Sequence, residues 1–116
     1  YLQYTAVRAG ALLEKGKVLG ITQHLDTPVQ GTETLERLIA RFIEVAGEAQ
    51  KSWAPHYVVS YLLELAQAFN SWYGQGKIVD AEDVSGTAYR LSVVAAARQT
   101  LINGLWVLGI ETPEKM

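Results

Sequence analysis

Apolar residues recur every three to four positions along four long stretches of the chain, which is the spacing of helices that bury one face. The stretches cover about residues 1–15, 32–49, 55–73 and 85–108. The third has the widest apolar face, which predicts a central helix with neighbours on several sides. No stretch alternates apolar and polar residues as a strand would. The pattern therefore predicts an all-α protein, an antiparallel helical bundle of four to five main helices.

Glycine, proline and capping residues indicate where these helices should begin and end. Gly16 is expected to be the left-handed residue that stops the first helix, and residues 17–31 are expected to form a loop. Thr32 is a favourable N-cap for the second helix, and Pro55 suits the first helical position of the third. Gly86 leaves room for a break near the start of the fourth helix.

The C-terminal tail has the residues of a well-terminated helix followed by a sharp turn. Gly109 stands where a left-handed residue belongs, and Ile110 follows as the apolar residue that folds back toward Leu105. Pro113 prevents the helix from continuing. We therefore expect the tail to lie against the body and to carry Met116 onto a binding surface.

The length of 116 residues suits a single domain spanning the whole chain, residues 1–116. The chain starts at Tyr1 inside a helical pattern, without an initiator Met, so we expect a C-terminal fragment of a longer protein. It contains no cysteine and no apolar run long enough to span a membrane, and its first residues lack the basic and apolar regions of a signal peptide, so none is expected. We expect a cytoplasmic protein with no membrane partner.

The charge of the chain lacks the basic excess of most nucleic-acid-binding proteins. Ten basic residues face twelve acidic ones, which gives a net charge of -2. Phosphate contacts normally supply much of the affinity for nucleic acid. Any such role must therefore rest on local contacts, or on charge that other domains supply.

Catalytic and metal-binding motifs are missing from the sequence. His24 and His56 fall in a loop and at a helix start, and nothing in the sequence pairs them with each other. No metalloprotease, calcium-loop or dinucleotide motif occurs. Gly74-Gln75-Gly76-Lys77 superficially matches a phosphate loop, but it follows a helix and is better interpreted as a helix stop. We expect no catalytic residue, no metal site and no independent catalysis.

Aromatic residues offer the more informative chemistry. Tyr1, Tyr4 and Arg8 share one helix face, and Phe69 and Tyr73 lie one turn apart on another helix. Unpaired RNA bases stack on aromatic rings and on guanidinium planes. The alternative is that these rings are core or half-buried packing residues, which is the commoner use of aromatic residues at helical spacing. By the same argument, three other aromatic residues are expected to be packing residues: Trp53, Tyr89 and Trp106.

Four sequence blocks resemble one known domain in the same order. They are YLQYTAVR (1–8), LERLIARFIEVA (35–46), APHYVVSYLLELAQAFNSWY (54–73) and RLSVVAAARQTLINGLWVLGIETPEKM (90–116). Together they resemble the all-helical DALR anticodon-binding domain at the C-terminus of arginyl-tRNA synthetases. The LGIxxPxxM-like ending is similar to the tail of that family, which makes the related glycyl and cysteinyl enzymes poorer matches.

The resemblance implies a function that composition does not. The domain would hold the anticodon stem-loop of arginine tRNA, and its partners would be that tRNA and the catalytic domain of the same chain. The whole enzyme would join arginine to its tRNA with ATP. ATP and arginine would bind the catalytic domain, where the HIGH- and KMSK-type elements belong, so no cofactor is expected in this fragment.

The resemblance also implies site residues, carried over position by position. The expected RNA-contacting residues are Tyr1, Tyr4, Arg8, Tyr73, Lys77 and Met116. Met116 would pack against a flipped anticodon base beside Tyr4 and Tyr73, and Lys77 and Lys115 would make weak phosphate contacts. Gln3 and Asn70 also match positions of the family's motifs, where their role would be either structural or in contact with the RNA.

The chain departs from the family pattern after Tyr73. Gly74 replaces a frequent Asn, and Gly76-Lys77 replaces a Cys-Arg or similar pair. Lys77 keeps a positive charge but not the bidentate geometry of arginine. A competing interpretation of the whole chain is a non-catalytic helical protein-interaction or structural domain, whose exposed apolar residues dock another domain.

Overall fold

The structure, a computed structural model, describes residues 1–52 and 55–113, with side chains for all of these except residues 49–52. Five helices form this part of the chain: α1 (Leu2–Val18), α2 (Glu33–Ala40), α3 (Phe42–Ser52), α4 (His56–Tyr73) and α5 (Val84–Val107). The residues described contain no strand. The prediction of an all-α bundle with four to five main helices is therefore confirmed.

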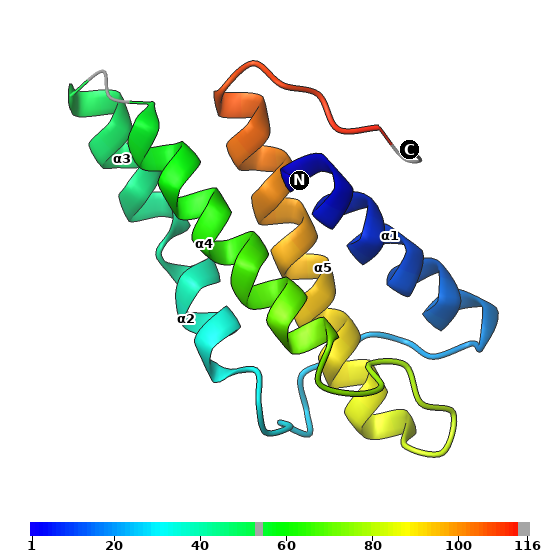
Figure 1. Cartoon of the computed structure of the whole chain (residues 1–116). Coiled ribbons are helices and arrows are strands. Elements are labelled where there is room, and N and C mark those ends of the chain that lie inside the picture. Colours follow the sequence, from blue (N-terminus) through cyan, green and yellow to red (C-terminus); the bar gives the residue numbers. More distant parts are fainter. Residues whose placement is uncertain (53–54, 114–116) are drawn as a thin grey trace.

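The helix α4 is central, as its broad apolar face predicts. It runs antiparallel to α5, with α2 and α3 along one side and α1 across the other side of the bundle (Figure 1). Helix α4 contacts all four of the other helices. Its buried face consists of Val58, Tyr61, Leu62, Leu65, Ala66, Phe69 and Trp72. This arrangement leaves the last turn of α4 beside α1.

Helix α1 packs most extensively against α5, and small side chains make this close approach possible. Ala6 and Ala9 are fully buried. A Cβ atom added at Gly16 would lie 2.4 Å from Cδ1 of Leu91 on α5. The first and last helices of the described chain therefore form one rigid pair, and this pair fixes the position of α1 relative to α4.

Gly16 is not the end of the first helix, and this expectation is wrong. The helix continues to Val18, and the left-handed residue is Gly20, with φ of 71°. The amide of Ile21 donates to the carbonyl of Gly16 (3.0 Å), which closes a Schellman turn around Gly20. Gly16 lacks a side chain because Leu91 packs there, so its role is packing and not chain reversal.

The predicted second helix, residues 32–49, is in fact two helices that meet at Arg41. In a continuous helix the carbonyl of Leu38 would accept the amide of Phe42. Here the buried hydroxyl of Tyr61 on α4 donates to that carbonyl, and the Arg41 amide also reaches it in a tighter turn (3.2 Å). A tertiary contact therefore replaces the helical bond at the break.

The remaining boundaries differ only slightly from expectation. Pro55 is the N-cap of α4 and not its first helical residue. Helix α5 begins at Val84 without a break at Gly86, because the carboxylate of Asp83 caps the helix by accepting the Gly86 amide (3.1 Å). The helix stop after Tyr73 is confirmed.

Candidate nucleic-acid interface

Residues from α1 and α4 meet in one group, here called the tyrosine–arginine cluster: Tyr1, Tyr4, Arg8, Asn70 and Tyr73. The guanidinium carbon of Arg8 lies 5.1 Å from the ring centroid of Tyr4 and 4.1 Å from that of Tyr73. Both distances are within the range of cation–π attraction. The structure thus brings together residues from two helices that the sequence places more than 60 positions apart.

Asn70 connects the members of the cluster by hydrogen bonds. Its Oδ1 accepts from Nη1 of Arg8 (2.8 Å), and its Nδ2 donates to the hydroxyl of Tyr1 (3.1 Å). Nη2 of Arg8 donates to the hydroxyl of Tyr4 (3.1 Å). Asn70 also reaches the hydroxyl of Thr5 (2.9 Å), a buried residue that the sequence does not mark as part of the site. The only sequence signal for Thr5 is a polar residue on an otherwise apolar helix face.

The tyrosines of the cluster are too exposed to be core residues. Tyr1 is 64% exposed, Tyr4 51% and Tyr73 37%. Phe69, by contrast, is fully buried and packs edge-on against Trp72, as the packing alternative predicts. The packing interpretation is therefore right for Phe69, and the RNA-contacting roles of the three tyrosines stay predictions.

The other aromatic residues expected to pack divide in the same way. Tyr89 is buried and donates to a carboxylate oxygen of Glu36 on α2 (2.6 Å). That hydrogen bond raises the pKa of Tyr89. Trp106 is 68% exposed near the end of α5, so its expected packing role is wrong. Trp53 lies outside the described residues.

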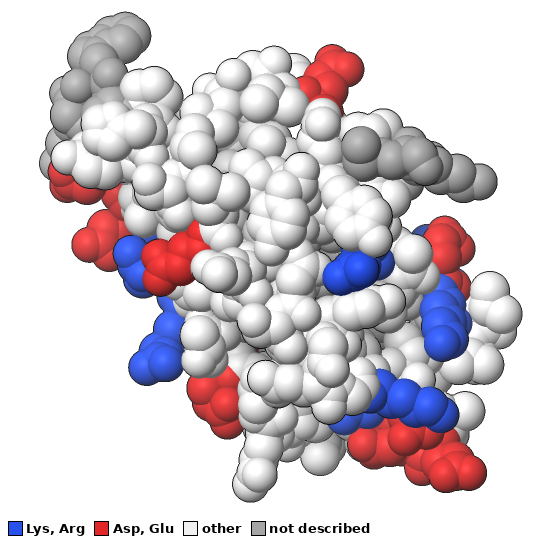
Figure 2. Space-filling view, viewed as in Figure 1, with Lys and Arg blue, Asp and Glu red and all other residues white. Residues whose placement is uncertain are grey.

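On the face shown in Figure 2, charged side chains are dispersed and do not form a basic patch. Figure 2 shows basic and acidic side chains scattered around a wide uncharged surface. Within the described part of the chain, the ion pairs formed by acidic side chains involve other basic groups and leave Arg8 without a carboxylate partner. Among the described residues, the charge of Arg8 therefore faces aromatic rings and not a carboxylate.

The tail begins as the sequence predicts. Gly109 has φ of 79°, and the amide of Ile110 donates to the carbonyl of Leu105 (2.8 Å), which completes a Schellman motif. The carbonyl of Glu111 then accepts from Nε2 of Gln3 (2.7 Å), so the tail is tied to the start of α1. Lys115 and Met116 lie outside the described residues.

Lys77 is exposed in the connection between α4 and α5, four positions after Tyr73. The next residue, Ile78, is buried, and its carbonyl accepts from Nε of Arg90 (2.8 Å). The segment that carries Lys77 is therefore anchored to α5.

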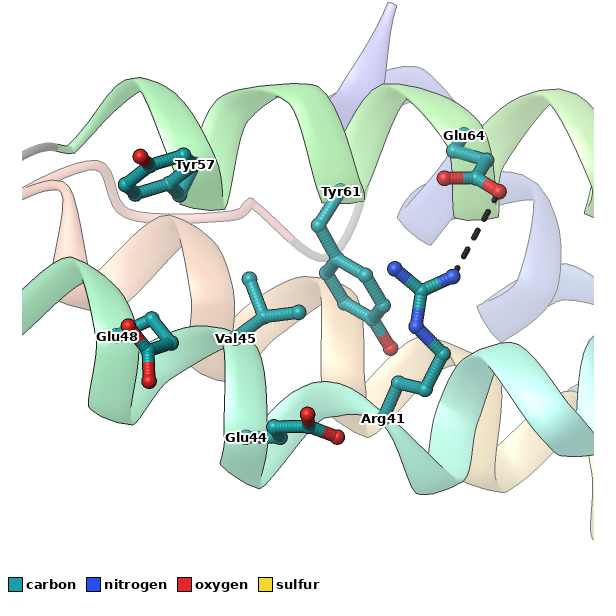
Figure 3. Close-up of a pocket in the computed structure, with 7 residues that line it drawn as sticks. All are labelled: Arg41, Glu44, Val45, Glu48, Tyr57, Tyr61 and Glu64. Atoms are coloured by element: carbon teal, nitrogen blue, oxygen red, sulfur yellow. Dashed lines mark ion pairs between the residues drawn. The ribbon is translucent and has the colours of Figure 1, made fainter.

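A separate hollow of about 360 Å³ lies between α3 and α4 (Figure 3). Arg41 and Glu64 form an ion pair across it (3.8 Å), and Tyr61 points into the space between the helices. Burial raises the pKa of Tyr61 to about 12. With Glu44 and Glu48 also lining it, the hollow carries more acidic than basic groups, which disfavours nucleic acid.

The described part of the chain gives no support for a metal site or for a membrane-spanning helix. Across residues 1–52 and 55–113, no three His, Cys, Asp or Glu side chains gather as metal ligands. Among the helices of the same residues, none combines the length and hydropathy needed to cross a lipid bilayer.

Three exposed tyrosine rings and one guanidinium, held on packed helices, form a surface typical of domains that stack unpaired nucleotides. Rigid helices are also better supports for such a surface than loops, because they hold the side chains in place before binding. Fold and cluster together define an all-helical domain with an exposed aromatic surface.

Comparison with known proteins identifies its family. Residues 2–116 match the DALR anticodon binding domain, and the chain belongs to this family. Over its full length it is 38% identical to the arginine–tRNA ligase of Listeria welshimeri and 34% identical to that of Bacillus pumilus. The chain spans 22% of the length of each relative.

A solved structure agrees with this assignment. The whole chain superposes on part of the arginyl-tRNA synthetase of Thermus thermophilus with a TM-score of 0.78 at 31% sequence identity, and it covers 21% of that chain. The family resemblance drawn from the four sequence blocks is therefore confirmed.

Proposed function

We propose that this chain is the anticodon-binding domain of an arginine–tRNA ligase and that the tyrosine–arginine cluster contacts the anticodon loop of arginine tRNA. The whole enzyme joins arginine to its tRNA with ATP, and its catalytic domain is the second partner of this chain. The observation that carries the proposal is the guanidinium of Arg8 held between the exposed rings of Tyr4 and Tyr73. Membership of the DALR family and the ligase relatives support it.

Stacking explains how a domain with net charge -2 would bind RNA. Each base stacked on an aromatic side chain contributes about 1–3 kcal/mol, without any excess of positive charge. Tyr1, Tyr4 and Tyr73 offer three rings for bases that leave the loop stack. Met116 and Lys115 of the tail, together with Lys77, complete the proposed contacts. The tail would reach the RNA beside the face of α1 that carries Gln3.

The direct test is a titration of the chain with anticodon stem-loops of arginine tRNA and of a tRNA for another amino acid, at two salt concentrations. We expect tighter binding of the arginine stem-loop at both salts, with a shallow salt dependence because few phosphates are neutralised. Equal affinity for the two stem-loops would contradict the specific part of the proposal.

The competing function is a protein-interaction or structural domain, and exposed apolar residues favour it. Trp106, Val107 and Ile110 are exposed around the end of α5, and Leu63 is exposed on α4. The two functions are separated by Trp106→Ala. If the chain acts only by docking another protein domain, this variant loses its partner and the stem-loop titration shows no specific binding in either variant or parent.

A further inference from the structure

Asn70 is the polar centre of the tyrosine–arginine cluster, although its own side chain is only half-exposed between α1 and α4. One carboxamide accepts from Arg8 and donates to both Tyr1 and Thr5. These partners precede it by 62, 69 and 65 residues. A single short side chain on α4 therefore holds three side chains at the start of α1.

The directions of these hydrogen bonds require a side chain that both accepts and donates. The hydroxyl of Thr5 donates to the carbonyl of Tyr1 (2.9 Å), so its lone pairs face the N–H of Asn70. On the other side, the cation of Arg8 needs an acceptor. Asparagine offers both functions on one planar group. A carboxylate would serve Arg8 but would face the lone pairs of Thr5, and an aliphatic side chain would serve neither.

We propose that Asn70 is a positioning residue for RNA binding, which fixes Arg8 and Tyr1 in their binding geometry before RNA arrives. The inference rests on the proposed function. Arginine has many rotamers, and holding it in one of them in advance removes an entropy cost from association. Because the fixed guanidinium also contacts the rings of Tyr4 and Tyr73, the same bond orders the whole surface.

The test compares Asn70→Ala with Asn103→Ala, a matched control on α5. Asn103 is exposed, and its recorded side-chain hydrogen bond comes from Gln99 on the same helix (2.8 Å). In the absence of RNA, NMR signals of the Arg8 guanidinium report its rotation. We expect hindered rotation in the parent chain and in the control, and free rotation in Asn70→Ala.

Affinity for the arginine anticodon stem-loop is the second readout. We expect about tenfold weaker binding for Asn70→Ala, because the side chains of Arg8 and Tyr1 are then no longer ordered before RNA binds. We expect no change for the control. The double variant Asn70→Ala/Arg8→Ala should bind only slightly more weakly than Arg8→Ala alone, because most of the effect of Asn70 passes through Arg8 and only a smaller part through Tyr1. Additive losses would mean an independent contact with RNA and would overturn the inference, as would unchanged affinity in Asn70→Ala.

Two further outcomes are separable. If the parent chain shows no preference for the arginine stem-loop, the proposed function fails, while the guanidinium signals still decide whether Asn70 holds Arg8. If Asn70→Ala does not fold, Asn70→Asp replaces it, since the carboxylate keeps an acceptor for Arg8. Arg8 should then stay hindered, and free rotation in Asn70→Asp would overturn the inference.

Discussion

Substitution of Arg8 tests the cluster most directly, and the structure sets the expected magnitudes. Arg8→Ala removes a 2.8 Å hydrogen bond to Asn70, a 3.1 Å hydrogen bond to Tyr4 and the stacking on Tyr73. Because Arg8 is only partly buried, water replaces much of what is lost. We expect the free energy of unfolding to fall by about 1–2 kcal/mol. That loss is small enough to leave the chain folded at 25 °C.

The expected loss of RNA affinity is larger than the loss of stability. Removing one stacking platform costs about 1–3 kcal/mol of binding free energy, which is about 5- to 150-fold in affinity. Fluorescence anisotropy with a labelled arginine anticodon stem-loop measures this loss, and urea denaturation measures stability on the same samples. Both measurements are made at a temperature where parent and variant are fully folded.

Arg8→Lys is the matched control, because it keeps the positive charge but not the planar fork. We expect its salt dependence to equal that of the parent, and its affinity to fall close to that of Arg8→Ala. Parent-like affinity in Arg8→Lys would refute the reasoning, since charge alone would then suffice. A loss of stability in both variants with unchanged RNA binding would assign Arg8 a purely structural role.

Three further predictions concern packing, pH and the tail. Gly16→Ala should lower the free energy of unfolding by up to about 2 kcal/mol, because overpacking against Leu91 exceeds the gain in helix propensity. Gly47→Ala on α3 should raise it by up to about 1 kcal/mol, since beyond its own stretch of helix the new Cβ meets no described atom within 4 Å. Equal signs in urea denaturation would contradict this. The pKa of Tyr61 is about 12 in the folded chain, against the ordinary value of 10.0 that applies to the unfolded chain. Its contribution to stability is therefore complete below pH 10 and is lost as the pH rises toward 12, and Tyr61→Phe should lose this dependence in denaturation curves. Deletion of residues 114–116 should weaken stem-loop binding far more than it lowers the Tm, and parent-like binding would exclude a role for the tail.

The helical pattern was sufficient to predict the architecture, because each helix buries an apolar face that its own sequence displays. The exceptions have tertiary causes. Glycine is a residue type that often ends helices, which is why the sequence predicts a stop at Gly16. In the structure, Gly16 instead makes room for Leu91, which lies 75 positions away along the chain. The break at Arg41 has no glycine or proline to mark it, since it depends on the hydroxyl of Tyr61. Neither partner is visible from the local sequence.

The site was predictable in part. Spacing places Tyr1, Tyr4 and Arg8 on one face, and the structure shows that both tyrosines are exposed. Spacing does not show that Asn70 links α1 to α4, because hydrogen-bond direction depends on how the helices dock. The roles of Lys77 and Met116 stay predictions, as does contact between any cluster residue and RNA.

The pairing of α1 with α5 has a consequence for the order in which the site can form. These are the first and last helices to be synthesised in the described chain, and α1 lies against α5 over most of its length. Contacts between such distant segments form late, because the intervening chain must first be closed into a loop. We therefore expect α1 to complete its docking only when α5 is available to pack against it, so the tyrosine–arginine cluster should form late in folding and not gradually during synthesis.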